Sequence, residues 1–314
     1  MYISSIIITN IITVGNYAKA EKLWSKLLKR FRKKFGDSHP PTLTTMMNLA
    51  NAYDCQGKHS DAEVLYKQCL DIQNVTLGES HPSTLAAMHN LAITYGSQGK
   101  YRDAEVLYKK CLDKMKVVLG ERHPHTLGTM NGLAGTYDKQ GKYRDAEVLF
   151  KQILDKQKAA LGDIHPDTLH TMNNLALTYS NQDKHRDAEV LLKQILDKMK
   201  VQRGENHPDT LLSMSNLAGI YINQVKYQGA EMLYKQILDK RKVVLGDSHP
   251  DTLHTMNNLA ATYDRQGKYR DAEVLLKQCL AKRKLVLGEN HPDTLSAMSG
   301  LERVTVTMLS LIHI

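Results

Sequence analysis

The sequence predicts an all-α solenoid of stacked helix pairs, and three observations support this prediction. The dipeptide His-Pro recurs with a constant step of 42 residues, at positions 39, 81, 123, 165, 207, 249 and 291. Apolar residues within each repeat follow helical spacing, and strand-like alternation is missing between residues 39 and 301. Periods of this length are typical of arrays in which each unit buries its apolar face against its neighbours.

The N-terminal part does not open with a complete repeat. Residues 1–14, MYISSIIITNIITV, form a β-branched string where a first helix should stand, so we expect an irregular or non-native segment. This string is too short to span a membrane and lacks the basic start and cleavage site of a signal peptide. Residues 15–38 align with the second helix of a repeat and are predicted to form a partial repeat.

Six tandem repeats span residues 39–290, and each is predicted to open with a helix that starts at His-Pro. Proline suits the first turn because it has no N–H to lose, and Asp167 favours the positive end of the helix dipole. The buried side of this first helix is read from apolar residues at helical spacing. In the fourth repeat they are Leu169, Met172, Leu175, Ala176 and Tyr179.

A second helix follows a short turn in each repeat and ends at a glycine suited to a left-handed cap. In the fourth repeat its apolar side comprises Ala188, Leu192, Ile195 and Leu196. The turn between the two helices also carries glycine in most repeats, but Asp183 and Val225 replace it in the fourth and fifth. Because a β-branched residue resists positive φ, we expect a distorted turn in the fifth repeat.

The pattern also stops at the C-terminal end. Residues 291–301 start a seventh repeat, and residues 302–314 form an off-pattern tail with Thr305 in the place of tyrosine and no second helix. Solenoids need polar caps over their terminal apolar faces, and neither end of the array has one. We therefore expect a fragment, or ends that come from outside the natural reading frame; the alternative is a diverged cap.

Composition and motifs argue against an enzyme, a cofactor and a metal site. Cys69, Cys111 and Cys279 occupy a place that isoleucine takes in other repeats, so we predict buried thiols without a disulfide and a reducing compartment, with Cys55 exposed. Seven of the fourteen histidines lie in His-Pro, one repeat apart, and form no zinc-type cluster with cysteine. Phosphate loops and nucleophile elbows are missing.

The net charge of +9 keeps nucleic-acid binding open as a less favoured alternative. The segment KLLKRFRKKFG, residues 26–36, is strongly basic. Most other lysines alternate with acids on the second helices, where they are typical of i,i+4 pairs, and no stacking aromatic surface accompanies them. A nucleic-acid binder would show a steep dependence of affinity on salt.

The face of the first helix opposite its buried side carries a repeating polar signal. Helical spacing assigns His170, Asn174, Leu177 and Asn181 to this face, and glycine replaces the asparagine at 132 and 300. A ladder of carboxamides could hold the backbone of an extended peptide, or each carboxamide could bond to the neighbouring helix; both interpretations stay open. The candidate peptide-binding residues are Asn48, Asn90, Asn174, Asn216 and Asn258, with Asn173, Asn257, His170, His254, Lys139 and Arg265 beside them.

The repeat pattern identifies a subtype. Met172, Leu175, Ala176, Tyr179, Ala188 and Leu192 stand where the tetratricopeptide signature places its residues. With its 42-residue step and the motifs NNLA, QGKY, DAE and LG-x-x-HP, the chain from about residue 16 to 301 resembles the tetratricopeptide array of kinesin light chains. The resemblance implies a right-handed superhelical solenoid whose first helices line a concave groove, in a cytoplasmic, microtubule-associated adaptor that links cargo to a motor.

For the binding residues, the resemblance implies that the five asparagines grip a cargo peptide's backbone and that Lys139 and Arg265 attract acidic side chains. The expected partners are proteins or peptides rather than membranes or nucleic acids. No heptad segment is present with which a light chain would join the heavy chain, so a kinesin heavy chain is a partner only if the full-length protein carries a coiled coil. The alternative is a general scaffold of the nephrocystin type, or the repeat region of a sensor protein, unconnected to kinesin.

Overall fold

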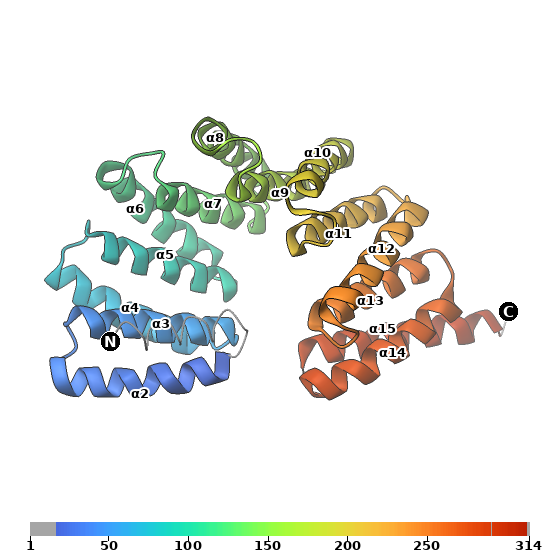
Figure 1. Cartoon of the computed structure of the whole chain (residues 1–314), viewed down its shortest axis with the longest axis horizontal. Coiled ribbons are helices and arrows are strands. Elements are labelled where there is room, and N and C mark those ends of the chain that lie inside the picture. The colour runs from blue at the N-terminus through green and yellow to red at the C-terminus, as the bar shows by residue number, and fades with distance from the viewer. Residues whose placement is uncertain (1–16, 290, 313–314) are drawn as a thin grey trace. The chain divides into compact units, whose positions relative to one another are not determined.

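The computed structural model describes residues 17–289 and 291–312, and their regular structure consists of fourteen α-helices (Figure 1). This confirms the predicted all-α array of helix pairs. The first helices of the repeats are α3 (Pro40–Cys55), α5 (Pro82–Ser97), α7 (Pro124–Lys139), α9 (Pro166–Asn181), α11 (Pro208–Asn223), α13 (Pro250–Arg265) and α15 (Pro292–Ile312). The second helices are α2 (Tyr17–Phe35), α4 (His59–Thr76), α6 (Tyr101–Val118), α8 (Tyr143–Leu161), α10 (His185–Arg203), α12 (Tyr227–Leu245) and α14 (Tyr269–Leu287). Residues 1–14, expected to be irregular, lie outside the described residues.

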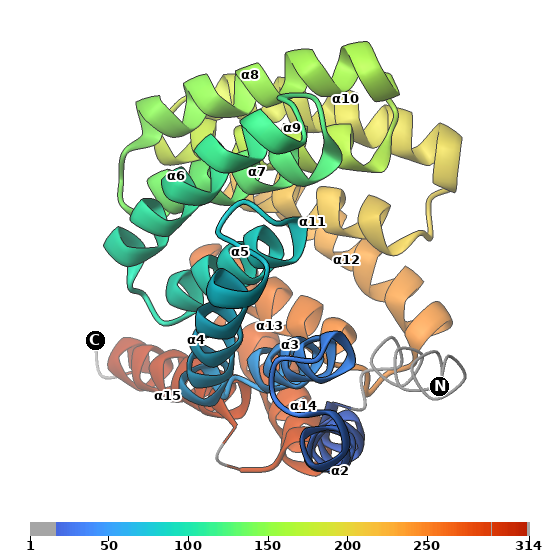
Figure 2. The ribbon, with the colours of Figure 1, turned by 90° about the vertical axis from the view of Figure 1, so that its left-hand side faces the viewer.

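The chain divides into two compact units, Met1–Ala160 and Leu161–Ile314. In the first unit the helices stack in chain order from α2 to α7, and Figure 2 shows this stack from the side. In the second unit each helix from α9 to α15 packs against the next. Consecutive first helices also touch, α3 with α5 and α5 with α7 in one unit, α9 with α11 and α13 with α15 in the other.

The histidine of every His-Pro except the first caps its helix through the side chain, a role that its sequence position did not reveal. Its Nδ1 accepts the backbone N–H two residues later, at 3.2 Å in α9 and in its equivalents. His39 makes no such bond, because residue 41 is a proline and has no N–H to donate. The helices begin at proline, as predicted.

A buried threonine ties each of several repeats to the helix before it. Thr84 donates to the carbonyl of Gly78 at 2.9 Å, and the same 2.9 Å bond joins Thr252 to Gly246. Each glycine has a φ near +88° and lies one or two residues after the end of a second helix, so the threonine satisfies a carbonyl at the helix end. The recurring glycine, histidine and threonine therefore act together to stabilise the turn between repeats.

The turn of the fifth repeat has the same geometry as the others, so the expected distortion is wrong. Lys226 donates its N–H to the Tyr221 carbonyl at 2.8 Å, and Lys268 makes the equivalent bond to Tyr263 at 2.9 Å. Val225 accommodates this turn with a φ of 61°, where its glycine equivalent Gly267 has 75°. The packed helix pair imposes the left-handed conformation on valine, whose branched side chain makes it unfavourable.

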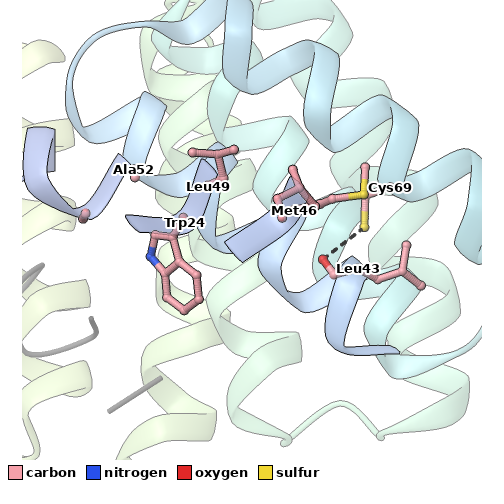
Figure 3. Packing of buried hydrophobic residues seen from close by; sticks show 8 residues of the cluster. Trp24, Leu43, Met46, Leu49, Ala52 and Cys69 are labelled. Atoms are coloured by element: carbon pink, nitrogen blue, oxygen red, sulfur yellow. Dashed lines mark hydrogen bonds between the residues drawn. The ribbon is translucent and has the colours of Figure 1, made fainter. Parts of the chain in front are cut away.

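The core consists of clusters of buried side chains between packed helices and contains the predicted cysteines. Figure 3 shows Trp24 of α2, Met46 of α3 and Cys69 of α4 in one cluster, and Trp24 is only 2% exposed. The Cys69 thiol donates to the Leu43 carbonyl at 3.8 Å, as the dashed line marks. Cys111 and Cys279 are fully buried as well, whereas Cys55 is exposed, so these four predictions are confirmed.

At the C-terminal end, α15 passes through the point where the sequence pattern stops. Residues 291–301 and 302–312 share this single helix, in which Val304 is fully buried against Leu276 of α14 and Ala260 of α13. No helix within residues 17–289 and 291–312 is long and apolar enough to cross a membrane.

Candidate peptide-binding face

One side of every first helix stays accessible while the other side forms the core. In α9 the accessible side comprises His170, Leu177 and Asn181, which are exposed, and Asn174, which is half-buried. We call the equivalent positions on all first helices the first-helix face. It is described separately in the two units, over α3, α5 and α7 in one and α9, α11, α13 and α15 in the other. The helical spacing of the sequence predicted this face correctly.

The five candidate asparagines are all half-buried, but their carboxamides are used differently. Asn90 hydrogen-bonds with the Tyr66 hydroxyl, and Asn174 donates to His170 Nε2 at 3.3 Å within α9. Asn216 donates to the side-chain oxygen of Asn173 at 3.2 Å. Among the described residues, the side chains of Asn48 and Asn258 have no hydrogen-bonding partner. The bond of Asn216 to Asn173 agrees with the interpretation that the carboxamide binds the neighbouring helix, and peptide binding by the asparagines stays a prediction.

Asn173 and Asn257 occupy equivalent positions on α9 and α13 but differ in accessibility. Asn173 is only 6% exposed, and it donates to Ser213 Oγ of α11 at 3.2 Å while it accepts from Asn216. These bonds tie α9 to α11 and leave the carboxamide no room for a ligand. Asn257 is half-buried and lines a pocket between α13 and α15.

Residue 132 of α7 is glycine, and the Tyr108 ring of α6 lies in the space beside it. A Cβ atom at Gly132 would lie 2.7 Å from the hydroxyl and the Cζ atom of Tyr108. The Tyr108 ring does not by itself exclude asparagine, because Tyr66 and Asn90 occupy the equivalent positions together. It also contacts the ring of His89 edge-on, with centroids 5.8 Å apart.

The remaining candidates lie at accessible positions. His170 and His254 are exposed near the starts of α9 and α13, and Lys139 and Arg265 are exposed at the ends of α7 and α13. The sequence reasoning named Leu177 as an apolar member of the face but did not single out Leu212 or Ile93. Leu212 is 48% and Ile93 45% exposed, and such side chains offer apolar contact to a ligand.

From α4 onward, lysines of the second helices form ion pairs with glutamates, as their i,i+4 spacing indicated. Glu63 accepts from Lys67 at 2.6 Å and from Lys100 of the following repeat at 2.8 Å. These two bonds, Lys100 first, lower the pKa of Glu63 to about 2. Both ammonium groups also lie under 6 Å from the ring of Tyr95. The cluster recurs around Glu105, Glu189 and Glu231.

Helix α2 carries most of the excess positive charge. It contains eight basic side chains against one acidic side chain, a net +7, while the whole chain has +9. Its apolar side, with Trp24 and Leu28, is buried in the core. Five exposed cations lie at helical spacing on the accessible side: Lys22, Lys26, Lys29, Arg30 and Lys33.

In the described part of the chain, no group of three or more histidine, cysteine, aspartate or glutamate side chains could hold a metal ion. No residue of the first-helix face stands in an acid-base or nucleophile arrangement in that same part. The first-helix face presents carboxamides, hydroxyls and apolar side chains, which are groups that can form hydrogen bonds and apolar contacts with a ligand.

Comparison with known proteins agrees with this architecture. The family model of the tetratricopeptide repeat matches residues 11–75, 129–200, 167–242 and 209–285, and a second tetratricopeptide repeat model matches residues 84–125. No curated protein matches the chain.

Several solved structures share the fold. The nearly identical TPR-like repeats of a Podosopora anserina protein assigned as a kinesin light chain are 29% identical, with 64% of this chain and 95% of that chain covered and a TM-score of 0.57. BtubC (BKLC) from P. vanneervenii is 21% identical, with 75% and 92% covered and a TM-score of 0.57. NprR in complex with its cognate peptide NprX is 17% identical, with 99% and 87% covered and a TM-score of 0.59.

The last two likenesses concern the fold alone, because both identities are low. The family models together match well over half of the chain, and the helix pairs, their caps and their spacing fit the matched repeats. This chain belongs to the tetratricopeptide repeat family.

Proposed function

We propose that this protein is a non-catalytic scaffold that binds extended peptide segments of partner proteins on its first-helix face. The observation that supports the proposal is the presence of free carboxamides on that face, those of Asn48 and Asn258. A carboxamide both donates and accepts, so it can bond to a peptide backbone whatever the peptide's side chains are. Exposed apolar neighbours such as Leu212 add contact area.

The comparisons supply a functional analogy for a peptide-binding adaptor. NprR is a fold relative solved with a bound peptide, and the Podosopora anserina relative is assigned as a kinesin light chain. We therefore extend the proposal to a cytoplasmic adaptor that carries cargo for a microtubule motor. A general scaffold without a motor is the alternative, and direct binding of the purified chain to kinesin heavy chain distinguishes the two.

The peptide-binding proposal is tested with peptides selected from a random display library against the whole chain. Affinities of the selected peptides are measured for the wild type, for Asn48→Ala and for Asn258→Ala by calorimetry. We expect each peptide to lose about two- to tenfold in affinity with one of the two variants, the size of one lost hydrogen bond. The matched control is Asn74→Ala on α4, a second helix. If both variants bind every peptide like the wild type, the assignment of this face is wrong.

A second function, binding of a nucleic-acid backbone, is supported by one observation, the row of exposed cations on α2. Surface lysines bind isolated carboxylates weakly, whereas contact with a phosphate polymer releases condensed counterions. Lysine and arginine side chains bind phosphates whatever the base sequence, so we expect binding that is independent of sequence.

This second function is tested by fluorescence anisotropy with a labelled DNA duplex of about 20 base pairs between about 50 and 200 mM salt. The variant Lys26→Gln/Lys33→Gln should bind more weakly and lower the salt slope by about 1.8. The control Lys109→Gln/Lys235→Gln removes the same charge from side chains already paired with Glu105 and Glu231. Equal losses in both variants would indicate net charge alone and would refute a site on α2.

A further inference from the structure

A pocket of about 320 Å³ opens on the first-helix face between α13 and α15. Its floor is apolar and consists of Ala260, Leu276 and Val304, of which none is more than 4% exposed. Asn257 of α13 and Ser296 of α15 line its sides. The pocket lies entirely within the second unit.

The cause of this pocket is a leucine and a glycine that meet in no other repeat. Leu276 lies on a second helix, α14, and Gly300 lies on the first helix that follows it, α15. The two residues lie close together, and every repeat has an equivalent pair of positions. In every other repeat the position of Leu276 has an aromatic residue, or the position of Gly300 has asparagine, or both are true. Only Leu276 and Gly300 combine a leucine with a glycine, and the space stays open.

The comparison with Gly132 shows that glycine alone does not make the pocket. At Gly132 the ring of Tyr108 fills the space, because an added Cβ would come within 2.7 Å of it. At Gly300 the nearest atom to an added Cβ is Leu276 Cδ2 at 3.5 Å, an ordinary contact distance. A substituent could therefore enter from the face side and rest on the leucine.

The charged groups at this pocket are already paired with each other. Arg303 Nη2 of α15 lies 2.9 Å from Asp264 Oδ2 of α13, and both side chains line the pocket. An ion pair with a solvent-exposed arginine leaves little net charge to attract a charged ligand. The apolar floor excludes a charged group as well, because burial of an unpaired charge is costly.

We propose that this pocket is the anchor subsite for one bulky uncharged side chain of a bound peptide, of the leucine or phenylalanine class. The volume of about 320 Å³ lies at the small end of the range for ligand pockets and has room for one bulky side chain. Asn257 and Ser296 stand at its sides with donors and acceptors for the peptide backbone next to that side chain. The inference rests on the proposed peptide-binding function and names the side chain that this part of the face selects.

The probe for the test is N-acetyl-phenylalaninamide, with N-acetyl-glycinamide as the same backbone unit without a side chain. Methyl NMR spectra of the whole chain are recorded during titration. We expect saturable shifts of the Leu276 and Val304 methyl signals with the phenylalanine amide and none with the glycine amide. The absence of these shifts, or equal shifts with both amides, would overturn the proposal.

Two variants close the pocket with residues that the chain itself uses at equivalent positions. Leu276→Tyr reproduces Tyr108 and Gly300→Asn reproduces Asn258, so each is compatible with the repeat fold. In both variants the Val304 shifts should disappear. Leu192→Tyr places the same ring on α10, opposite Asn216, and should leave the Val304 shifts unchanged. Shifts that persist in Leu276→Tyr would refute the subsite.

The two sets of experiments distinguish a failure of the subsite from a failure of the proposed function. If Asn48→Ala or Asn258→Ala weakens selected peptides while the probe causes no shift, the face binds peptides without this anchor. If the probe binds but the asparagine variants have no effect, the pocket is real and the backbone-binding role of those asparagines is wrong.

Discussion

The carboxamide of Asn216 donates to the side-chain oxygen of Asn173 at 3.2 Å and so joins α11 to α9. The two residues are 43 positions apart, one repeat and one residue. Asn173 forms a second bond between the same two helices, because it donates to Ser213 Oγ of α11. Here the repeated asparagines stabilise the array, while Asn48 and Asn258 keep their carboxamides available for a ligand.

Replacement of Asn173 should cost stability, whereas replacement of Asn258 should not. In Asn173→Ala, both Ser213 and Asn216 lose a partner in a buried place, and we expect a loss of about 1–3 kcal/mol in the free energy of unfolding. In Asn258→Ala the change should stay below about 0.5 kcal/mol, because no internal bond is broken. Urea denaturation followed by circular dichroism measures both. Equal losses would mean that the two asparagines have the same structural role.

The sequence predicted the helices, their starts at proline and the accessible face, because these depend on local spacing. It could not separate Asn173 from Asn174, which are neighbours in the chain, because their roles depend on contacts with α11, about one repeat away. The capping role of histidine was missed for a related reason, since it depends on the direction of the ring. The pocket at Gly300 was missed because two positions 24 residues apart in sequence had to be read together with their packing.

The distorted turn expected at Val225 is the clearest case in which tertiary structure overrides a local preference. A single valine disfavours positive φ by an amount that the packing of two helices exceeds. The sequence showed that valine disfavours the positive φ of this turn, but it did not show that the turn would keep its geometry.

One cysteine should react fast in the native protein and three should not. Cys55 is exposed, whereas Cys69, Cys111 and Cys279 are fully buried. Burial raises the pKa of the Cys69 and Cys111 thiols to about 12, which keeps the reactive thiolate scarce at neutral pH. Titration with Ellman's reagent should give a single fast thiol before denaturation and four thiols after it, and a Cys55→Ser variant should abolish the fast phase. More than one fast native thiol would contradict the burial of these side chains.

Stability should fall in acid through the glutamates between paired lysines. Hydrogen bonds from Lys100 and then Lys67 lower the pKa of Glu63 to about 2, and bonds from Lys109 and then Lys142 do the same for Glu105, against an ordinary value of 4.5. A lowered pKa in the folded state contributes stability above about pH 4.5, and this contribution is lost as the pH falls toward 2. Urea midpoints measured across this range should decrease steadily. Glu63→Gln should be less stable than the wild type at pH 7 and show a smaller decrease, whereas an identical decrease in the variant would exclude Glu63 as a source.

Glycine in place of Val225 should stabilise the protein. Val225 holds a φ of 61° and is 67% exposed, so its removal relieves an unfavourable backbone conformation and sacrifices little burial. The left-handed conformation costs a branched residue about 1–2 kcal/mol, and the greater freedom of glycine in the unfolded chain offsets part of the gain, which leaves about 0.5–1 kcal/mol. The increase should appear as a higher urea midpoint for Val225→Gly. Gly267→Val, the same change reversed one repeat later, should lower the midpoint by a similar amount. Asp183→Gly should gain less, because aspartate tolerates this conformation better than valine does. If Val225→Gly is less stable than the wild type, the valine contributes contacts that outweigh its strain, and the turn is not held in place by the helix pair alone.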